Sequence, residues 1–507
     1  MMQPNLVNLA HPDRLFIGGQ WVKPSSNEKI VLISPSSEAK LGSVSAAANA
    51  DVDRAVAAAR QAFDYGPWPR LTGAQRAAMV RAIADQMQGR AEDFAQAWSL
   101  QVGMPLKHAQ ASAQNARGYM DYFAALGDNG FEEVRKPAQG TTCVVVHEPV
   151  GVVVAIVPWN APLATLLLKV APALVAGCTV IAKPSPESPL EAMVLAECVA
   201  AAGLPEGVFS VLPAGREVSD YLMRKPEVDK VSFTGSTAAG LHIASVCAAR
   251  SARVTTELGG KSAAIVLEDA KLETVVRGIM PNLIGLCGQQ CSAFSRILVP
   301  RARAAEITDA LVAAFKAVKV GDPFDPDTQM GPLVAKRQLD RVMGYIAQGQ
   351  KEGAKLVTGG KRPAHLGKGW YIEPTLFANV NNHMVIAREE IFGPVGVIIP
   401  FDSEEQAIAI ANDSPYGLSG GVFTEDTEHA YAVGRRIRTG NFTQNGRIID
   451  YTLPYGGFKQ SGIGREGGVE GLKSFTEIKS IFLPKPPVHL APSPSAVIKA
   501  TAKLAFS

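Results

Sequence analysis

The feature that most constrains the fold is an alternation of short β-branched runs with longer Ala-rich stretches through the middle of the chain. Residues 150–157 and 179–182 have the length and composition of buried strands, and residues 163–175 between them have those of a helix. Parallel strands need a crossover connection of this length, usually a helix. The alternation therefore predicts an α/β protein built on doubly wound parallel sheets.

This alternation of strands and helices occurs twice along the chain, which predicts two α/β domains with a boundary near residue 260. In the first, strands are expected over 150–157, 179–182, 207–212 and 228–233, and helices over 163–175, 189–202 and 218–224. In the second, a strand over 263–267 precedes a helix over 269–284 and a strand over 297–300. Helices over 51–63 and 72–94 are expected to pack on the first sheet, and 134–148 and 474–482 are predicted to be extended segments that pair across subunits.

Composition and charge exclude several classes of function. The 507 residues include 50 Lys or Arg and 47 Asp or Glu, and they contain no long run of like charges. A nucleic acid partner is therefore not expected. Residues 161–182 are long enough to cross a bilayer but contain Lys169 and Pro172, which predicts a buried helix, turn and strand and no membrane partner. Six cysteines in apolar settings and no export signal predict a cytoplasmic location.

A cysteine in a glycine-containing turn is the first candidate for chemistry. Residues 288–292 are Gly-Gln-Gln-Cys-Ser, and a thiol in such a turn is expected to be accessible and can act as a nucleophile. Cys287, four residues before Cys291, leaves the alternative that both are buried small hydrophobic residues. No histidine lies within ligand spacing, so no metal site is expected.

Three further motifs each have a functional and a structural interpretation. Glu257 ends a strand-like stretch before two glycines, and it is either a general base facing a cleft or a surface charge beside a turn. Residues 233–240 join a strand to a helix, where free backbone N–H groups either bind a phosphate or only begin the helix. Asn160 follows the strand over 152–157 and either holds an oxyanion or caps the next helix.

Taken together, seven motifs occur in an order and at spacings that resemble the aldehyde dehydrogenase superfamily. The resemblance covers roughly residues 15–482 and is carried by residues 158–160 (Pro-Trp-Asn), 183–185 (Lys-Pro-Ser), 233–236 (Phe-Thr-Gly-Ser), 257–261 (Glu-Leu-Gly-Gly-Lys), 288–291, 390–394 (Glu-Ile-Phe-Gly-Pro) and 456–466. It implies a cofactor-binding domain over 1–130 and 149–258, a catalytic domain over 259–470, an oligomerisation arm over 131–148 and 471–490, and a tail over 491–507. A homodimer or homotetramer is expected.

The resemblance implies oxidation of an aldehyde to a carboxylic acid, with NAD⁺ as the expected cofactor and NADP⁺ as the alternative. Cys291 is expected to attack the carbonyl, Asn160 and the Cys291 N–H to hold the oxyanion, and Glu257 to activate water that hydrolyses the thioester. Lys169 and Glu466 match a proton-relay pair. The implied cofactor site comprises Ile156, Pro158, Trp159, Lys183, Ser185, Gly215, Gly235, Ser236, Leu258, Glu390 and Phe392. The implied substrate tunnel comprises Ala161, Thr165, Leu168, Gln290, Ser292, Tyr451 and Tyr455.

Three positions depart from the usual family pattern. Pro186, followed by Glu187, stands where many members have a glutamate that holds the ribose hydroxyls, so the choice between NAD⁺ and NADP⁺ stays open. Leu286 stands where members commonly have an asparagine, five residues before the nucleophile. Ala161 stands where a bulky aromatic residue is frequent. This last change predicts a roomy apolar tunnel and a medium-sized apolar, aromatic or terpenoid aldehyde.

Other activities stay open at this point. Arg447, before Tyr451, is suited to clamp a carboxylate, which would make the substrate a semialdehyde. The semialdehyde branch of the superfamily includes enzymes that transfer the acyl group to CoA, but that branch generally lacks the carboxylate that Glu257 supplies here. An esterase that uses the cysteine without redox chemistry, or a binding protein without catalysis, is the alternative from another class.

Overall fold

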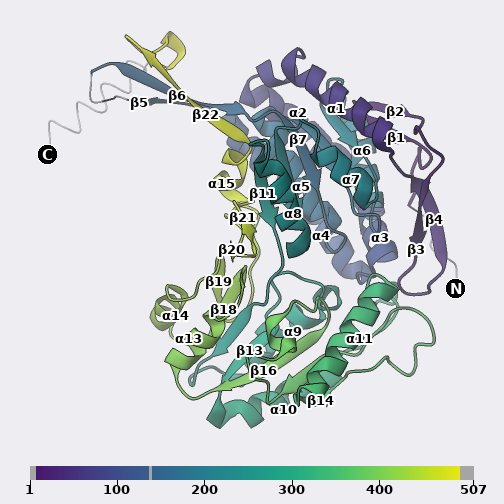
Figure 1. The fold of residues 1–507 in the computed structure, drawn as a ribbon, viewed down its shortest axis with the longest axis vertical. Helices are drawn as coiled ribbons and strands as arrows, with labels where there is room; N and C mark the ends of the chain where they lie inside the picture. The colour runs from purple at the N-terminus through teal and green to yellow at the C-terminus, as the bar shows by residue number, and fades with distance from the viewer. Residues whose placement is uncertain (1–6, 136, 138–139, 491–507) are drawn as a thin grey trace.

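The computed structural model describes residues 7–135, 137 and 140–490. Two large sheets lie one above the other in Figure 1, and a three-stranded arm projects from the upper body. Each large sheet has one buried apolar cluster on each of its faces, so the core is divided into four layers between sheets and helices. The predicted α/β class with two doubly wound units is confirmed.

The first sheet has eight strands in the order β2-β1-β9-β8-β7-β10-β11-β21. Its five central strands, from β9 to β11, are parallel, whereas β1, β2 and β21 run antiparallel to their neighbours at the edges. The strands are β1 Leu15–Ile17, β2 Gln20–Val22, β7 Val152–Ile156, β8 Thr179–Lys183, β9 Phe209–Val211, β10 Lys230–Thr234, β11 Arg253–Glu257 and β21 Gly462–Ile463. All four strands expected here are present, and β21 joins them from the far end of the chain.

Helices cover both faces of the first sheet. They are α1 Asn49–Asp64, α2 Gly73–Gly89, α3 Ala91–Val102, α4 Leu106–Asp128, α5 Pro162–Ala176, α6 Leu190–Ala202, α7 Arg216–Met223 and α8 Thr237–Ala248. The single helix expected over 72–94 is wrong, because Arg90 leaves the helical region between Gly89 and Ala91 and separates α2 from α3. Residues 161–182 form α5 and β8, as predicted. No helix of the described chain is long and apolar enough to span a membrane.

The second sheet has seven strands in the order β14-β15-β16-β13-β12-β18-β19, all parallel except β14. The strands are β12 Ala263–Val266, β13 Arg296–Pro300, β14 Lys355–Thr358, β15 Thr375–Ala378, β16 Val395–Phe401, β18 Ser419–Phe423 and β19 Asn441–Gln444. The helices of this part are α9 Leu272–Ile284, α10 Ala304–Lys316, α11 Lys336–Lys351, α12 Val385–Arg388, α13 Glu404–Asn412 and α14 Thr427–Gly434. After β21 the chain returns to the first part, where α15 Gly468–Lys473 packs against α5. The elements expected between residues 263 and 300 are confirmed.

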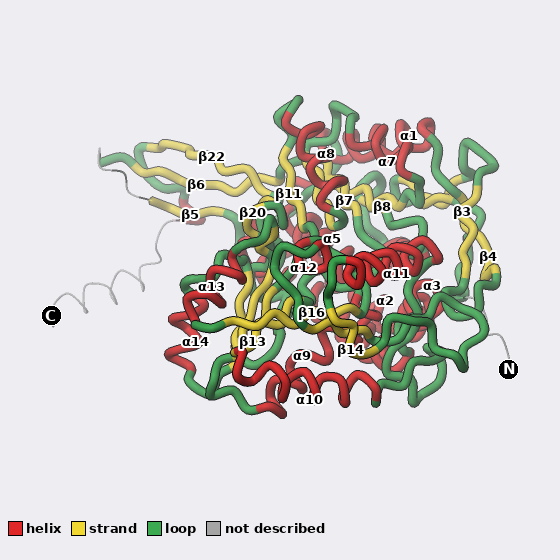
Figure 2. The backbone as a smooth tube through the Cα atoms, turned by 60° about the horizontal axis from the view of Figure 1, so that its bottom comes forward, coloured by secondary structure: helices red, strands yellow, loops and turns green. Residues whose placement is uncertain are grey.

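The arm is an antiparallel sheet in the order β22-β6-β5. Its strands are β5 Glu132–Arg135, β6 Thr142–Pro149 and β22 Thr476–Leu483, and Figure 2 shows it extending beyond the helices. The two predicted extended segments therefore pair with each other within one chain, and pairing across subunits stays a prediction. Two short pairs complete the described strands, β3 Lys29–Ile33 with β4 Lys40–Ser45 and β17 Tyr416–Gly417 with β20 Phe458–Lys459. The predicted tail, residues 491–507, lies outside the described residues.

Candidate active site

A cavity of about 500 Å³ lies at the carboxyl ends of the parallel strands of the first sheet. Residues that follow β7 and β10 line it together with Glu257 at the end of β11, and the turn around Cys291 closes it from the second sheet. This edge is where open α/β sheets bind ligands. The predicted residues that line it are Pro158, Trp159, Asn160, Ala161, Thr165, Leu168, Gly235, Ser236, Glu257, Leu258, Gln290, Cys291, Ser292, Glu390, Phe392, Tyr451, Tyr455 and Glu466.

The turn that carries the candidate nucleophile has a strained backbone. Before it, the short 3₁₀ segment Gly285–Gly288 holds Leu286 and Cys287 at positive φ angles of 51° and 54°. Asparagine, which the family commonly has in place of Leu286, adopts this conformation more readily than leucine does. Gly288 also has a positive φ, and a Cβ there would lie 2.2 Å from the carbonyl oxygen of Gly393. The turn therefore requires glycine at 288 and carries strain at 286.

The Cys291 thiol is less accessible than the turn predicts. Surrounding protein raises its pKa to about 11, chiefly by burial and then through the charges of Glu390 and Glu257. Tyr455, whose Oη lies 3.8 Å from Cys291 Sγ, and Arg447 lower the pKa. Cys287 is only 2% exposed, and burial raises its pKa too. Of the two sulfurs, Cys291 is the one that lines the cavity, and Cys287 packs as a small hydrophobic residue.

Asn160 presents its amide to the same cavity and does not cap the following helix. The N-cap of α5 is Ala161, which makes no side-chain capping bond. Asn160 Nδ2 instead donates to the carbonyl oxygen of Gln289 at 2.9 Å, which ties it to the turn of Cys291. Trp98 Nε1 donates to the Asn160 carbonyl oxygen at 2.9 Å and fixes its backbone. The amide nitrogen carries a second hydrogen, so the group can also donate to an oxyanion.

Glu257 is a buried carboxylate without a partner, and the surface-charge interpretation is wrong. Its side chain ends β11 and is 3% exposed, and within the described chain neither carboxylate oxygen accepts a hydrogen bond. Burial raises its pKa well above the usual value, the charge of Glu466 raises it further, and Lys169 and Arg465 oppose the shift. A carboxylate with a raised pKa that faces a cavity has the properties of a general base.

Lys169 and Glu466 form a buried ion pair behind Glu257. Lys169 Nζ donates to Glu466 Oε1 and, at 2.7 Å, to Thr234 Oγ1. Ser232 Oγ donates to the same oxygen of Glu466 at 3.1 Å. Only Glu466 of the pair lines the cavity. The two residues that sequence analysis assigned to a proton relay are therefore in direct contact, although 297 positions separate them.

The junction of β10 and α8 has the features of an anion site, with one difference from expectation. Gly235 N–H is not free, because it donates to the carbonyl oxygen of Glu257 at 3.0 Å. Ser236 caps α8 by accepting from Ala239 N at 3.4 Å, and the opening N–H groups of the helix have no acceptor within the helix. The helix packs so closely on Leu258 at Gly240 that a Cβ there would lie 2.2 Å from Leu258 Cδ2. Glycine at this position therefore allows the close approach.

Aromatic and acidic groups line the cavity beside this junction. The rings of Trp159 and Phe392 meet edge to face at 5.3 Å. Glu390 Oε1 accepts from Gly260 N at 3.1 Å, and burial raises the pKa of its carboxyl to about 7. Glu390 and Phe392, which come from the second part of the chain, thus meet Trp159 of the first part and form a polar and aromatic wall of the cavity.

Four of the predicted cofactor residues lie outside the cavity wall. Ile156 and Lys183 end the neighbouring strands β7 and β8, Ser185 follows β8, and Gly215 is the N-cap of α7. Burial lowers the pKa of Lys183 to about 8.

A charged cluster follows β8 at the position where the sequence departs from the family pattern. Ser185 Oγ donates to Glu187 Oε2, and Arg337 Nη2 donates to Glu187 Oε1 at 2.8 Å. Glu187 thus lies beside the predicted ribose-binding residues and is neutralised by an arginine from α11.

Sequence analysis missed several residues that line the cavity. Tyr119 from α4 stacks on Tyr451 with ring centroids 4.3 Å apart, and Gln338 and Arg341 come from α11. Neither helix carries a local motif, so nothing in the sequence near these residues marked them. Only the packing of α4 and α11 brings them to the site.

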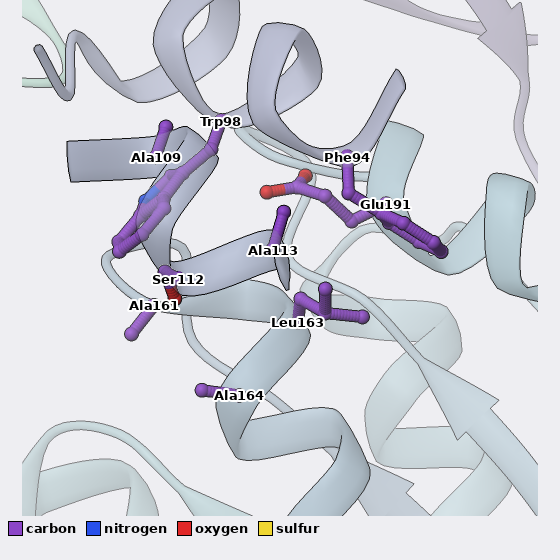
Figure 3. A pocket seen from close by; sticks show the side chains of 9 residues that line it. All are labelled: Phe94, Trp98, Ala109, Ser112, Ala113, Ala161, Leu163, Ala164 and Glu191. Atoms are coloured by element: carbon purple, nitrogen blue, oxygen red, sulfur yellow. The ribbon is translucent and has the colours of Figure 1, made fainter. Parts of the chain in front are cut away.

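A second, small cavity adjoins the wall of the first. It measures about 10 Å³ and shares Ala161 and Ala164 with the large cavity, and Figure 3 shows the Glu191 carboxyl pointing into it. Glu191 Oε2 accepts from Gln101 Nε2 at 2.8 Å, and in the described chain Oε1 has no partner. Burial raises the Glu191 pKa to about 8. A neutral carboxylic acid therefore lies behind the wall at Ala161.

Comparisons with known proteins identify the family of the chain. The chain is 45% identical to geranial dehydrogenase from Castellaniella defragrans and 43% identical to 3-succinoylsemialdehyde-pyridine dehydrogenase from a Pseudomonas species, and each alignment covers 92% of this chain and 98% of the relative. An NAD⁺ complex of a Mycobacterium tuberculosis aldehyde dehydrogenase superposes with a TM-score of 0.91 at 46% identity, covering 94% of this chain and 99% of the other. The family model described as "Aldehyde dehydrogenase family" matches residues 21–481. The chain belongs to the aldehyde dehydrogenase family.

Proposed function

We propose that the protein oxidises a medium-sized apolar aldehyde, aromatic or terpenoid, to its carboxylic acid with NAD⁺. The observation that carries this proposal is the meeting of a thiol, an amide and an unpartnered carboxylate in one cavity of the described chain, at Cys291, Asn160 and Glu257. These are the three groups that oxidation through a thioester requires: a nucleophile, an oxyanion donor and a base for hydrolysis.

In this mechanism, Cys291 Sγ attacks the aldehyde carbon and forms a thiohemiacetal. Asn160 Nδ2 and the Cys291 N–H donate to its oxygen, and each such donor is worth about 3–4 kcal/mol in a comparable site. A bound NAD⁺ would supply the acceptor for the hydrogen and two electrons that leave the aldehyde carbon. Glu257 then takes a proton from water, which attacks the thioester, releases the acid and restores the thiol. Glu466 and Lys169 are near enough to shift the Glu257 pKa, which supports a relay for that proton.

Residues that line the cavity, together with Lys183 outside its wall, fit a dinucleotide. The opening of α8 at Ser236 offers N–H groups to a pyrophosphate, Lys183 suits a ribose hydroxyl, and Glu390 suits the second ribose. The carboxylate of Glu187 would repel the 2′-phosphate of NADP⁺, but its contact with Arg337 reduces this repulsion, and a guanidinium itself binds phosphate well. NAD⁺ is the proposed cofactor and NADP⁺ the alternative. Under this proposal, residues 1–130 and 149–258 bind the cofactor and residues 259–470 supply the nucleophile.

The wall of the cavity favours an apolar substrate. Ala161, Leu168, Ile449 and Tyr451 present mostly apolar surface, and a relative at 45% identity is named a geranial dehydrogenase. A semialdehyde is the second candidate, because Arg447 reaches the cavity and another relative is named for a semialdehyde. Transfer of the acyl group to CoA is disfavoured by Glu257, which promotes the competing attack of water. A non-redox esterase or a silent binding protein would leave the cofactor-binding features without a role.

The arm supports a proposed homodimer or homotetramer. Ile478 and Phe482 of β22 are 68% and 65% exposed, and apolar surface of this kind on a projecting sheet is suited to another subunit. All six cysteines are free, which supports a reducing, cytoplasmic location.

The test is the formation of reduced nicotinamide by the purified protein without CoA. NAD⁺ and NADP⁺ are compared in parallel against short aliphatic, long aliphatic, aromatic, terpenoid and semialdehyde substrates. The proposal predicts the highest kcat/KM for the bulky apolar set with NAD⁺. Strong preference for acetaldehyde or betaine aldehyde would contradict the substrate class. Activity that appears only after CoA is added would contradict the hydrolytic mechanism.

A further inference from the structure

Arg447 brings a positive charge to the wall of the active-site cavity without a carboxylate to balance it. It lies in the loop between β19 and β20, its side chain is mostly buried, and it forms no ion pair within the described chain. Nη1 donates to Ser292 Oγ at 2.8 Å, and Nη2 donates to Gln290 Oε1. Ser292 and Gln290 are the residues on either side of Cys291, so one guanidinium contacts both neighbours of the nucleophile.

We propose that Arg447 is a positioning residue for Cys291, which fixes both flanks of the turn and balances the negative charge of the thiolate. The inference rests on the proposed role of Cys291 as the nucleophile. A buried cation costs free energy unless an anion or strong acceptors compensate it, and the neutral side chains of Ser292 and Gln290 compensate only in part. When Cys291 loses its proton, its thiolate supplies an anion that can compensate the buried guanidinium.

The other charged groups that act on Cys291 oppose a thiolate, and Arg447 counters them. Glu390 and Glu257 both oppose a negative charge on the sulfur, whereas Tyr455 and Arg447 favour it. No histidine is among the described residues that line the cavity, so the usual cationic partner of a catalytic cysteine is missing. Tyr455 Oη lies 3.8 Å from the sulfur and can donate to it once the thiol is ionised, and Arg447 is the cation that acts on the sulfur.

The contacts of Arg447 favour this role over that of a substrate clamp. A bidentate clamp directs two N–H groups of one guanidinium at the same carboxylate. Here Nη1 and Nη2 already donate to two different protein side chains, one on each side of Cys291. A substrate carboxylate would have to displace at least one of these bonds.

The test measures the thiol directly, by the rate of alkylation with iodoacetamide as a function of pH. Mass spectrometry and Cys291→Ala identify the reacting sulfur. Arg447→Met should raise the midpoint of the pH profile by about one unit, which slows alkylation about tenfold at pH values below the midpoint. Arg447→Lys keeps the positive charge, so its midpoint should lie close to that of the wild type, although lysine cannot contact both flanking residues. Tyr455→Phe should raise the midpoint as well.

Arg301→Met is the matched control, because Arg301 is an exposed arginine bonded to Asp402 and does not line the cavity. It should leave the midpoint unchanged. If Arg447→Met does not fold, Arg447→Gln replaces it with a neutral side chain that still forms hydrogen bonds. An unchanged midpoint in the neutral variant would overturn the inference, and a large rise in KM confined to carboxylate-bearing semialdehydes would then assign Arg447 as a clamp. Aldehyde oxidation by Cys291→Ala would instead refute the proposed function itself.

Discussion

Replacing Glu257 by glutamine should separate the two halves of the reaction. The glutamine side chain has the same size and would fill the same buried space, but its amide cannot accept the proton of the attacking water. General-base catalysis typically contributes about 10²–10⁴ in rate, which is about 3–5 kcal/mol of transition-state stabilisation. Because neither oxygen of Glu257 has a partner in the described chain, its removal leaves no broken hydrogen bond elsewhere. The loss should therefore fall on hydrolysis and not on folding.

The assay is rapid mixing of enzyme, NAD⁺ and aldehyde, followed at the absorbance of reduced nicotinamide. Glu257→Gln should produce a burst of about one equivalent per active site and then a steady rate lowered by the factor given above. In the wild type, the ionised form of Glu257 accumulates as the pH rises through its raised pKa, so the steady rate should increase over that range. The steady rate of the variant should not show this increase. A variant with a normal steady rate, or with neither burst nor turnover, would refute the assignment of Glu257 to hydrolysis.

Three further changes test other parts of the account. Glu187→Gln removes the carboxylate beside Ser185 and frees Arg337, so the ratio of kcat/KM for NADP⁺ to that for NAD⁺ should rise about tenfold in steady-state assays; a fall would contradict the proposed ribose site. Glu191 holds its proton up to a pKa of about 8 in the folded state, so its contribution to stability falls as pH rises from about 4.5 to that pKa, by up to about 1.4 kcal/mol per pH unit. Urea unfolding should show a flatter pH dependence for Glu191→Gln, and an identical slope would contradict the buried neutral acid. Leu286→Asn should relieve about 1 kcal/mol of backbone strain and raise the apparent unfolding temperature, whereas a lower temperature would show that the side-chain packing of leucine outweighs the strain.

The sequence could predict those strands and helices that are marked by the composition of their own residues. The strands β7, β8 and β10 are buried on both faces, and such strands appear as continuous β-branched runs. The break between α2 and α3 was missed because hydrophobic periodicity continues across it, and Gly89 was the only signal. The return of β21 to the first sheet had no signal, since pairing with β11 depends on the position of a segment about 200 residues away.

The sequence could predict only those site residues whose side-chain chemistry and position beside a predicted strand both indicate a role. Asn160 follows β7 and Glu257 ends β11, so their place at the carboxyl edge of the sheet could be predicted from the topology. The sequence could not tell whether Asn160 caps α5 or faces the cavity, because the two cases differ by one residue in where the helix begins. In the structure the N-cap is Ala161, so Asn160 is free to face the cavity. The thiol environment of Cys291 could not be predicted, because the groups that shift its pKa come from distant segments. The contacts of Arg447 and the aromatic wall at Tyr119 likewise follow from tertiary packing.

The measurement that tests the central claim most directly compares aldehyde oxidation by the wild type, Cys291→Ala and Cys287→Ala without CoA. Both sulfurs lie in the same short segment, but only Cys291 lines the cavity. The account predicts reduced nicotinamide from the wild type, none above background from Cys291→Ala and most of the wild-type rate from Cys287→Ala. Turnover by Cys291→Ala, or equal losses from both substitutions, would contradict the account.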